Sequence, residues 1–333
     1  MNELENVYLT GSVSPVAFKR SEAAMKHIII DFDNTMGVTG CDVDDGLALL
    51  YLLGNPELCQ VHAACTTYGN STLDIVHGNT VRLFGELGID IPVYRGAPSP
   101  VLPMGQGRLK AFQQLPPLAD VTSEAARFMA KAAAAEPGKY SILATGSTTN
   151  LLGAQQVDPQ FFDNIAEVVL MGGITESLVI TEGRIMDELN LSCDPDATLA
   201  ILGSGARVSI ATANNCLPAY FERETFASAF SPGSLLSRMI DYWFGDMVER
   251  YAWPGFVAWD MVSAAILIKP ELFEDVVRDT TLYRRMLAIG YLEEASPGAP
   301  SAPVHTPVIA DPHALIADAL VGWKRALEIL GIA

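Results

Sequence analysis

Cationic residues are scarce in this chain of 333 residues, where 21 lysines and arginines stand against 39 aspartates and glutamates and the formal net charge is −18. Nucleic acids and anionic membranes bind basic surfaces, so this charge argues against both as partners. The acidity fits a protein that handles small neutral or cationic ligands, and it serves solubility equally well.

Cysteine is also rare, with five residues and no CxxC spacing. An odd number of thiols without metal-type spacing favours reduced, mostly buried cysteines in a cytosolic protein. The N-terminal stretch MNELENVYLTGSVSPVAFKR lacks a basic segment followed by an apolar one, so we expect no signal peptide. No run is long and apolar enough to span a bilayer. We therefore expect a cytoplasmic protein.

Hydrophobic residues make up 50% of the chain, which is enough for a large core. Short apolar runs alternate with helical patterns. We predict strands at 27–31, 60–70, 91–96, 166–173 and 206–215, a strand that runs into a polar turn at 140–150, and helices at 44–55, 72–88, 123–136 and 195–202. Continuous apolar strands that alternate with helices predict an α/β fold, with an open and mainly parallel sheet flanked by helices on both faces.

The chain shows no internal repeat and no clear linker, so we predict a single domain over 1–333 with an N-terminal extension at 1–26. The stretch LEEASPGAPSAPVHTP at 292–307 is rich in proline and alanine, and we predict that it is an exposed loop. Polar residues follow strand after strand. Because ligands bind at the carboxyl ends of strands in open parallel sheets, we expect these residues to line one crevice.

Five aspartates crowd into IIIDFDNTMGVTGCDVDDGLALL at 28–50, namely Asp31, Asp33, Asp42, Asp44 and Asp45. Like charges at this spacing repel, so they need a cation, a proton or solvent. A helix start favours carboxylates, which accounts for Asp44 and Asp45 but not for all five. The DFDNT motif resembles the DxDxT nucleophile motif of haloacid dehalogenase-type phosphatases, which use Mg²⁺. Several carboxylates together also suit one Ca²⁺ with oxygen ligands.

The motifs along the chain resemble those of the nucleoside hydrolases, the inosine-uridine and purine preferring N-ribohydrolases that depend on Ca²⁺. Asp31-Phe32-Asp33 and Asp44-Asp45 are similar to the family's DxDxGxDD-type fingerprint, stretched here by the insertion NTMGVTGCDV. Later motifs follow in the family's order, namely TTYGN (66–70), TGSTTN (145–150), VVLMGG (168–173), DELNLSCDPDA (187–197) and WDMVSAAILIKPELF (259–273). The matched blocks cover about residues 27–275.

The resemblance implies Ca²⁺-dependent hydrolysis of the N-glycosidic bond of ribonucleosides to ribose and free base. It implies that Asp33, Asp45, Asp260 and the backbone carbonyl of Thr149 bind the ion, and that Asp33 is also the general base. Its implied substrate contacts are Asp44, Asn70, Met171, Glu182, Glu188, Asn190 and Trp259. The expected partner is a small-molecule nucleoside, and related enzymes imply a homodimer or homotetramer.

Two of these positions depart from the family pattern. Glu182 stands where the family has a sugar-binding asparagine, and Trp259 stands where many members have a histidine that is implicated in protonating the leaving base. An indole cannot be a general acid, but it resembles the purine-preferring branch, in which the base stacks on an aromatic ring. We therefore expect purine nucleosides to be favoured. The phosphatase and a non-catalytic nucleoside or sugar binding protein are the alternatives.

Overall fold

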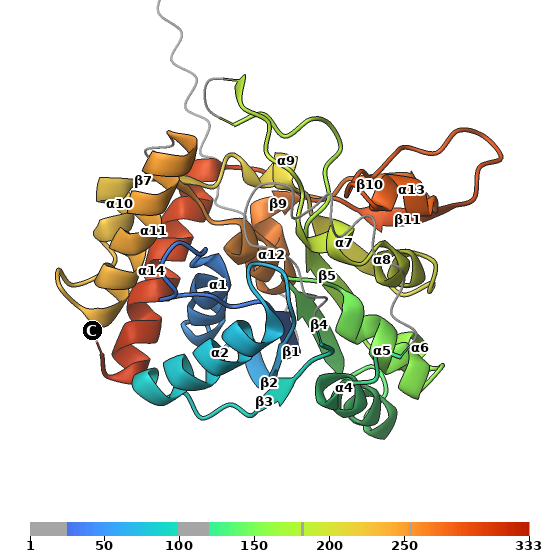
Figure 1. Cartoon of the computed structure of the whole chain (residues 1–333), viewed down its shortest axis with the longest axis horizontal. Helices are drawn as coiled ribbons and strands as arrows, with labels where there is room; N and C mark the ends of the chain where they lie inside the picture. The colour runs from blue at the N-terminus through green and yellow to red at the C-terminus, as the bar shows by residue number, and fades with distance from the viewer. Residues whose placement is uncertain (1–24, 99–119, 181–182, 253–254, 333) are drawn as a thin grey trace, which may run out of the picture.

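An eight-stranded sheet forms the centre of the computed structural model, which describes residues 25–98, 120–180, 183–252 and 255–332, without the side chains of 246–251 (Figure 1). The strand order is β10-β11-β6-β5-β4-β1-β2-β3. The bounds are β1 Lys26–Phe32, β2 Cys59–Thr66, β3 Val93–Arg95, β4 Tyr140–Ala144, β5 Glu167–Met171, β6 Val208–Ala211, β10 Val277–Thr281 and β11 Ser301–His305. All neighbouring pairs are parallel except β10 with β11, which confirms the predicted fold class.

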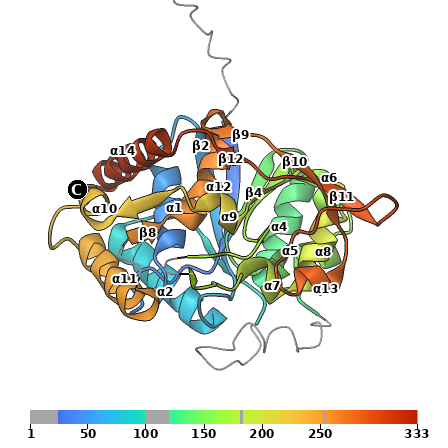
Figure 2. The same ribbon diagram turned by 90° about the horizontal axis from the view of Figure 1, so that it is seen from above.

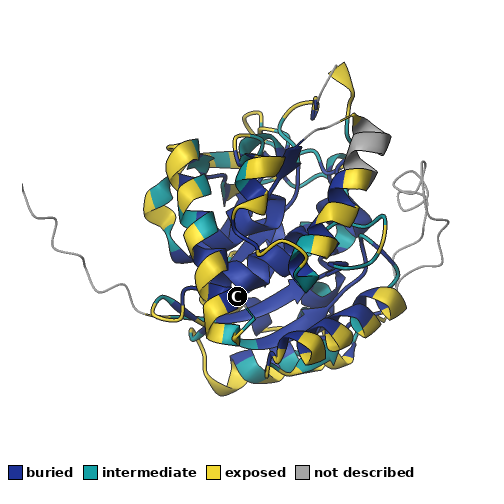
Figure 3. Cartoon of the chain, turned by 90° about the vertical axis from the view of Figure 1, so that its left-hand side faces the viewer, coloured by how far each residue is buried: buried dark blue, intermediate teal, exposed yellow. Residues whose placement is uncertain are grey.

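Strand β1 shows why the apolar runs are continuous. Its three isoleucines are fully buried, with Ile28 and Ile30 on one face of the sheet and Ile29 on the other. Successive side chains of a strand point to opposite faces, so a strand with helices on both sides has no face left for polar residues. The dark blue core in Figure 3 follows this central sheet.

Two layers of helices cover the sheet, and Figure 2 shows them on its two sides. One layer packs on the face of Ile28 and contains α1 Asp44–Leu53, α2 Leu73–Leu87, α11 Leu235–Tyr251, α12 Trp259–Ile268 and α14 Pro312–Leu330. The other layer packs on the face of Ile29 and contains α4 Glu124–Ala135, α5 Thr149–Val157, α6 Phe161–Asn164, α8 Pro195–Leu202 and α13 Arg284–Leu287.

Shorter elements complete the described fold. They are α7 Asn190–Cys193, α9 Ala213–Cys216, α10 Arg223–Ala227, the 3₁₀ turn η2 Pro270–Leu272, and two small sheets that pair β7 Tyr220–Glu222 with β8 Gly255–Val257 and β9 Phe273–Glu274 with β12 Val308–Ile309. Among the described helices, none combines the length and the hydropathy needed to cross a membrane.

The strand order reverses direction at β1 and β4, because the chain proceeds to β2 and β3 on one side and to β5 and β6 on the other. Helices leave this point toward opposite faces, so a crevice opens at the carboxyl ends of these two strands. Residues directly after Phe32 and Ala144 therefore lie where a ligand is expected to bind.

The predicted exposed loop at 292–307 is wrong for its second half. Residues 301–305 form β11, which pairs with β10 and joins β6 at His305, and Val304 is fully buried. Pro303 is compatible with this strand because an antiparallel ladder takes N–H donors only from alternate residues. The predicted N-terminal extension lies outside the described residues up to residue 24, and Lys26 already belongs to β1.

Candidate active site

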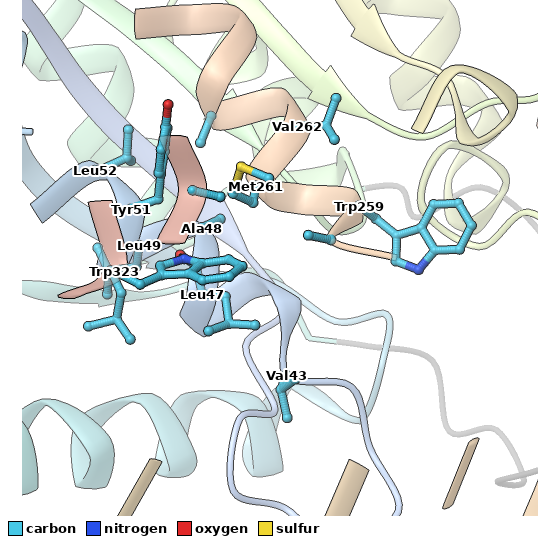
Figure 4. Close-up of a cluster of buried hydrophobic side chains, with 14 of the residues drawn as sticks. Val43, Leu47, Ala48, Leu49, Tyr51, Leu52, Trp259, Met261, Val262 and Trp323 are labelled. Atoms are coloured by element: carbon cyan, nitrogen blue, oxygen red, sulfur yellow. The ribbon is translucent and has the colours of Figure 1, made fainter. Parts of the chain in front are cut away.

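Three segments bring four buried aspartates together at the carboxyl end of the sheet. Asp33 follows β1, Asp44 and Asp45 begin α1, and Asp260 is the second residue of α12. One carboxylate oxygen from each of Asp44, Asp45 and Asp260 lies within 4.8 Å of the other two. The packing of α1 on α12 fixes this arrangement, and Figure 4 shows apolar side chains of both helices in one buried cluster.

Asp33 is fully buried, and two glycines pack against it. Its carboxylate accepts a hydrogen bond from the backbone N–H of Asn70, and the Asn70 side-chain amide lies 3.5 Å from Oδ1. A Cβ atom on Gly69 would lie 1.9 Å from Asp33 Oδ2, and one on Gly146 would lie 2.9 Å from Asp33 Cγ. Only glycine therefore fits at these two approaches to the carboxylate.

Two residues from the segments that follow β2 and β4 hydrogen-bond to the Asp45 carboxylate. Thr145, directly after β4, donates its hydroxyl to Asp45 Oδ1 at 2.8 Å, and Asn70 Nδ2 donates to Asp45 Oδ2 at 3.2 Å. Thr145 belongs to the polar segment 145–150 that was expected to line the crevice, but no individual role was predicted for it. Its position at the end of a predicted strand was the available signal, because strand ends of a parallel sheet meet at one crevice.

The carboxyls of this cluster raise one another's pKa. Burial is the largest cause at Asp44, Asp45 and Asp260, and repulsion from neighbouring aspartates adds to it, so the pKa of each lies well above its usual range. No ion pair among the described residues involves these three side chains. A set of buried, mutually repelling oxygen donors is what a hard divalent cation such as Ca²⁺ or Mg²⁺ needs.

A second layer of polar side chains supports the aspartates. Asn150 Nδ2 donates to Asp31 Oδ1 at 2.8 Å, and burial raises the pKa of Asp31 to about 8. Thr149, the first residue of α5, is fully buried and donates its hydroxyl to Asp194 Oδ2 at 2.8 Å. Asp31 therefore lies behind the site, and Thr149 lies at the helix start that follows the polar turn after β4.

A cavity opens beside the aspartates, with about 510 Å³ of empty space that includes part of its mouth. The predicted residues on its wall are Asp44, Asn70, Met171, Glu188, Asn190, Trp259 and Asp260. The predicted contact Glu182 lies outside the described residues.

Glu188 and Asn190 are tied to the backbone around the cavity. Glu188 accepts three backbone N–H groups, from Gly173 at 3.1 Å and from Leu191 and Ser192 at 2.8 Å each. A carboxylate has about four acceptor positions, so about one is left for a ligand. Asn190 Nδ2 donates to the carbonyl oxygen of Thr145 at 2.8 Å and thereby joins this segment to the end of β4.

Trp259 begins α12 and lies on the cavity wall with 5% of its surface exposed. In Figure 4 its ring points away from the apolar cluster around Trp323, whereas Met261 of the same helix points into it. None of the five histidines lines the cavity. Trp259 is thus placed to contact a ligand, and no imidazole is placed to give it a proton.

Sequence reasoning gave no role to two further parts of the wall. Asp42 lies in the insertion, lines the cavity and accepts the backbone N–H of Val43 at 2.7 Å. Leu178 and Met186 line it from a hairpin, in which the Met186 N–H donates to the Leu178 carbonyl at 2.9 Å. For Asp42 the only signal in the sequence was an aspartate two residues before a predicted helix. The hairpin gave no signal because it has no strong strand pattern.

Comparisons with known proteins agree with this geometry. The model of the family described as inosine-uridine preferring nucleoside hydrolase matches residues 28–311. The chain is 30% identical over 251 residues to a pyrimidine-specific ribonucleoside hydrolase, RihA, of Citrobacter koseri, covering 71% of this chain and 79% of the relative. It is 27% identical over 320 residues to a probable uridine nucleosidase 2 of Arabidopsis thaliana, covering 87% of this chain and 95% of the relative.

Solved structures share the fold. A plant nucleoside hydrolase, PpNRh1, superposes with a TM-score of 0.71 at 20% identity, covering 90% of this chain and 99% of that one. A purine-preferring ribonucleoside hydrolase from Gardnerella vaginalis superposes with a TM-score of 0.69 at 19% identity, covering 91% of this chain and 100% of that one.

Proposed function

The chain belongs to the inosine-uridine preferring nucleoside hydrolase family and is an enzyme that hydrolyses the N-glycosidic bond of ribonucleosides, and from this premise we propose that it depends on Ca²⁺ and favours purine nucleosides. The phosphatase alternative needs a lysine near the aspartates at a strand end. Lys139 does not supply it, because it pairs with Glu136 at the start of β4, at the opposite end of that strand from the aspartates. A binding protein without turnover is likewise set aside by the family.

The proposed ion is supported by one observation, the cluster of Asp44, Asp45 and Asp260 with Asp33 beside it. In the proposed assignment Asp33, Asp45, Asp260 and the Thr149 carbonyl bind Ca²⁺. A bound Ca²⁺ would fix the two ribose hydroxyls and acidify a bound water. Oxygen-only ligands favour Ca²⁺ over softer metals, although Mg²⁺ shares that preference.

The remaining residues act on the substrate. Asp33 takes a proton from the attacking water as general base, since the Asn70 N–H and the two glycines hold its carboxylate in one orientation. Asp44 and Asn70 bind ribose hydroxyls, and Asn190, Glu188 and Met171 form the wall beyond them. Development of positive charge on the ribose is favoured in this acidic site, as in other glycoside hydrolyses.

The base preference rests on Trp259. Its indole lines the cavity, and a purine stacks over more of an aromatic ring than a pyrimidine does. The names of the relatives from Citrobacter koseri and Arabidopsis thaliana point the other way, toward pyrimidine nucleosides and uridine. A ranking of substrates separates these two predictions directly.

A reducing-sugar assay tests the proposal. Inosine, adenosine, guanosine, uridine and cytidine are compared with Ca²⁺, with Mg²⁺ and after chelation, on the wild type, on Asp33→Ala and on Asp163→Asn. Asp163 is exposed in α6, before the start of β5, and serves as the control for a lost surface charge. We expect ribose release that needs Ca²⁺, is lost only in Asp33→Ala and is fastest for purines. Release without any divalent ion would refute the metal assignment, and uridine as the best substrate would refute the purine preference.

The cellular location and the assembly also remain proposals. We propose a cytoplasmic homodimer or homotetramer whose partner is a small-molecule nucleoside, supported by the family resemblance and the acidic composition. Sedimentation of the purified protein measures the subunit number, and a monomer at assay concentration would contradict the oligomer.

A further inference from the structure

Two histidines face each other on neighbouring strands, in the amino-terminal halves of β1 and β2. His27 Nδ1 lies 2.8 Å from His62 Nε2, and the centroids of the two rings are 5.0 Å apart. Both residues are partly exposed, so solutes can reach them. Asp33 lies six residues beyond His27, which is about 20 Å along an extended strand at about 3.3 Å per residue. The pair is therefore separate from the active site.

A β-bulge brings the two imidazoles together. The pairing of β1 with β2 shifts between Ile28 and Ile29, where His62 is the extra residue of β2. Ala63 packs in the core on the face of Ile29, and His62 lies on that same face, where its ring meets the Tyr140 ring edge-on at 5.3 Å between centroids. In a regular strand two successive side chains would point to opposite faces. Bulges re-aim side chains in this way and recur beside functional sites.

The facing nitrogens are spaced like two ligands of one metal ion. Imidazole nitrogens bind Zn²⁺ at about 2.0–2.1 Å, so at angles of about 90–110° two of them are about 2.8–3.4 Å apart. The observed 2.8 Å is at the short end of this range, and a small opening of the pair admits an ion. The ion would replace the shared hydrogen, and the donor ring would carry its proton on its outer nitrogen instead. Neither outer nitrogen hydrogen-bonds to a described residue, so both can hold a proton.

The surroundings of the pair decide which kind of ion fits. Imidazole is a ligand for Zn²⁺, Cu²⁺ and Ni²⁺, whereas Ca²⁺ and Mg²⁺ prefer oxygen ligands. The nearby Lys139 ammonium is paired with Glu136 at 2.8 Å, so its charge is compensated. Among the described residues no third aspartate, glutamate, histidine or cysteine joins the pair to form a group of three ligands. Water would fill the remaining positions, which gives a weaker site than a structural zinc site with four protein ligands.

We propose that His27 and His62 form a second ion site, which binds a divalent transition metal such as Zn²⁺ and bridges β1 and β2. An ion that binds only the folded chain stabilises it, and this ion would do so by linking two neighbouring strands of the central sheet. Such a site lies outside the active-site cavity and is independent of the proposed function.

Isothermal titration calorimetry with Zn²⁺ tests the site, in a buffer with excess Ca²⁺ that competes for the aspartate cluster. The wild type is compared with His27→Gln and His62→Gln, and His313→Gln is the matched control because His313 is exposed at the start of α14. Loss of one of two protein ligands is expected to weaken Zn²⁺ binding by at least about tenfold, since loss of an outer partner of a metal site already costs this much. His62→Cys exchanges one zinc ligand for another and should keep the binding.

Thermal melts give a second measurement. Zn²⁺ should raise the Tm of the wild type and of His313→Gln, and should raise that of His27→Gln and His62→Gln much less, because these two variants no longer hold the ion between the strands. Mg²⁺ in place of Zn²⁺ should give no difference in the Tm shift between the wild type and the two glutamine variants, since imidazole is a poor ligand for it.

Three outcomes would overturn the second ion site. The first is equal Zn²⁺ affinity in the wild type and both glutamine variants. The second is loss of Zn²⁺ binding in Asp260→Asn but not in His27→Gln, which would place the ion at the aspartate cluster. Anomalous diffraction from wild-type crystals soaked in Zn²⁺ locates the ion without any substitution, even where the glutamine variants do not fold. A peak between the two rings supports the site, and the absence of a peak there is the third outcome.

Discussion

Replacing Asn150 by alanine is expected to destabilise the whole fold, because this one amide joins four segments. It is fully buried, donates to Asp31 Oδ1 at 2.8 Å and to the Thr66 carbonyl at 3.0 Å, and accepts from the Ala97 N–H at 2.9 Å and the Ser123 hydroxyl at 3.1 Å. At about 1 kcal/mol for each hydrogen bond, the loss is about 4 kcal/mol. That is a large part of the roughly 5–15 kcal/mol that keeps a protein folded.

Urea unfolding followed by circular dichroism measures this loss. We expect a lower midpoint with an unchanged slope, which indicates that the same surface is exposed on unfolding. Asn164→Ala is the matched control, since Asn164 is partly exposed at the end of α6 and its side chain makes no hydrogen bond to a described residue. A change below about 1 kcal/mol in Asn150→Ala would refute the view that this amide links the strand ends.

Three further predictions concern the site. The pKa of Asp31 rises from 3.8 to about 8 on folding, so between these pH values the folded chain keeps a proton that the unfolded chain releases. In the presence of a chelator, the free energy of unfolding should therefore fall as the pH rises through this window, by up to about 1.4 kcal/mol per pH unit. Urea titrations measure this slope, and Asp31→Asn should flatten it. Ca²⁺ at about a hundred times its Kd should raise the free energy of unfolding by about 2.7 kcal/mol in thermal melts, and an equal rise in Asp260→Asn would contradict the ion assignment. Gly69→Ala, whose new Cβ would lie 1.9 Å from Asp33 Oδ2, should lower kcat by about a hundredfold, whereas Gly85→Ala in α2, where nothing lies within 4 Å, should not change it; equal rates would show that Asp33 can move without cost.

The sheet was predictable from sequence because its strands are buried on both faces. Runs such as Ile28 to Ile30 leave no amphipathic alternative, so local pattern and tertiary environment agree. Local pattern and tertiary environment agree less well at the ends of strands. The segment 140–150 was predicted as a strand that runs into a polar turn, and only the structure shows that the strand ends at Ala144, where Thr145 donates its hydroxyl to Asp45, and that α5 begins at Thr149. Strand β11 was missed because its pairing with β10 and β6 is long-range and leaves no local signal.

The site could be predicted where its residues are neighbours in the sequence, and less well where only folding brings them together. Asp33, Asp44 and Asp45 are visible as neighbours that repel one another. Asp42 received no role because it lies in an insertion, and only the folded chain shows this segment turning back, with the Thr35 hydroxyl bonded to the Asp42 carbonyl at 2.9 Å. The roles given to the individual site residues stay predictions until the variants above are measured.

The wide separation along the chain of the side chains proposed to bind the ion has a consequence for biosynthesis. Asp33 and Asp45 emerge early from the ribosome, but the cluster gains Asp260 only after the strands of the central sheet up to β6 have been made. A nascent chain therefore carries a group of repelling carboxylates whose closing member is still missing, and ion binding cannot help it fold. Capture of the proposed Ca²⁺ is therefore expected to be a late step of folding.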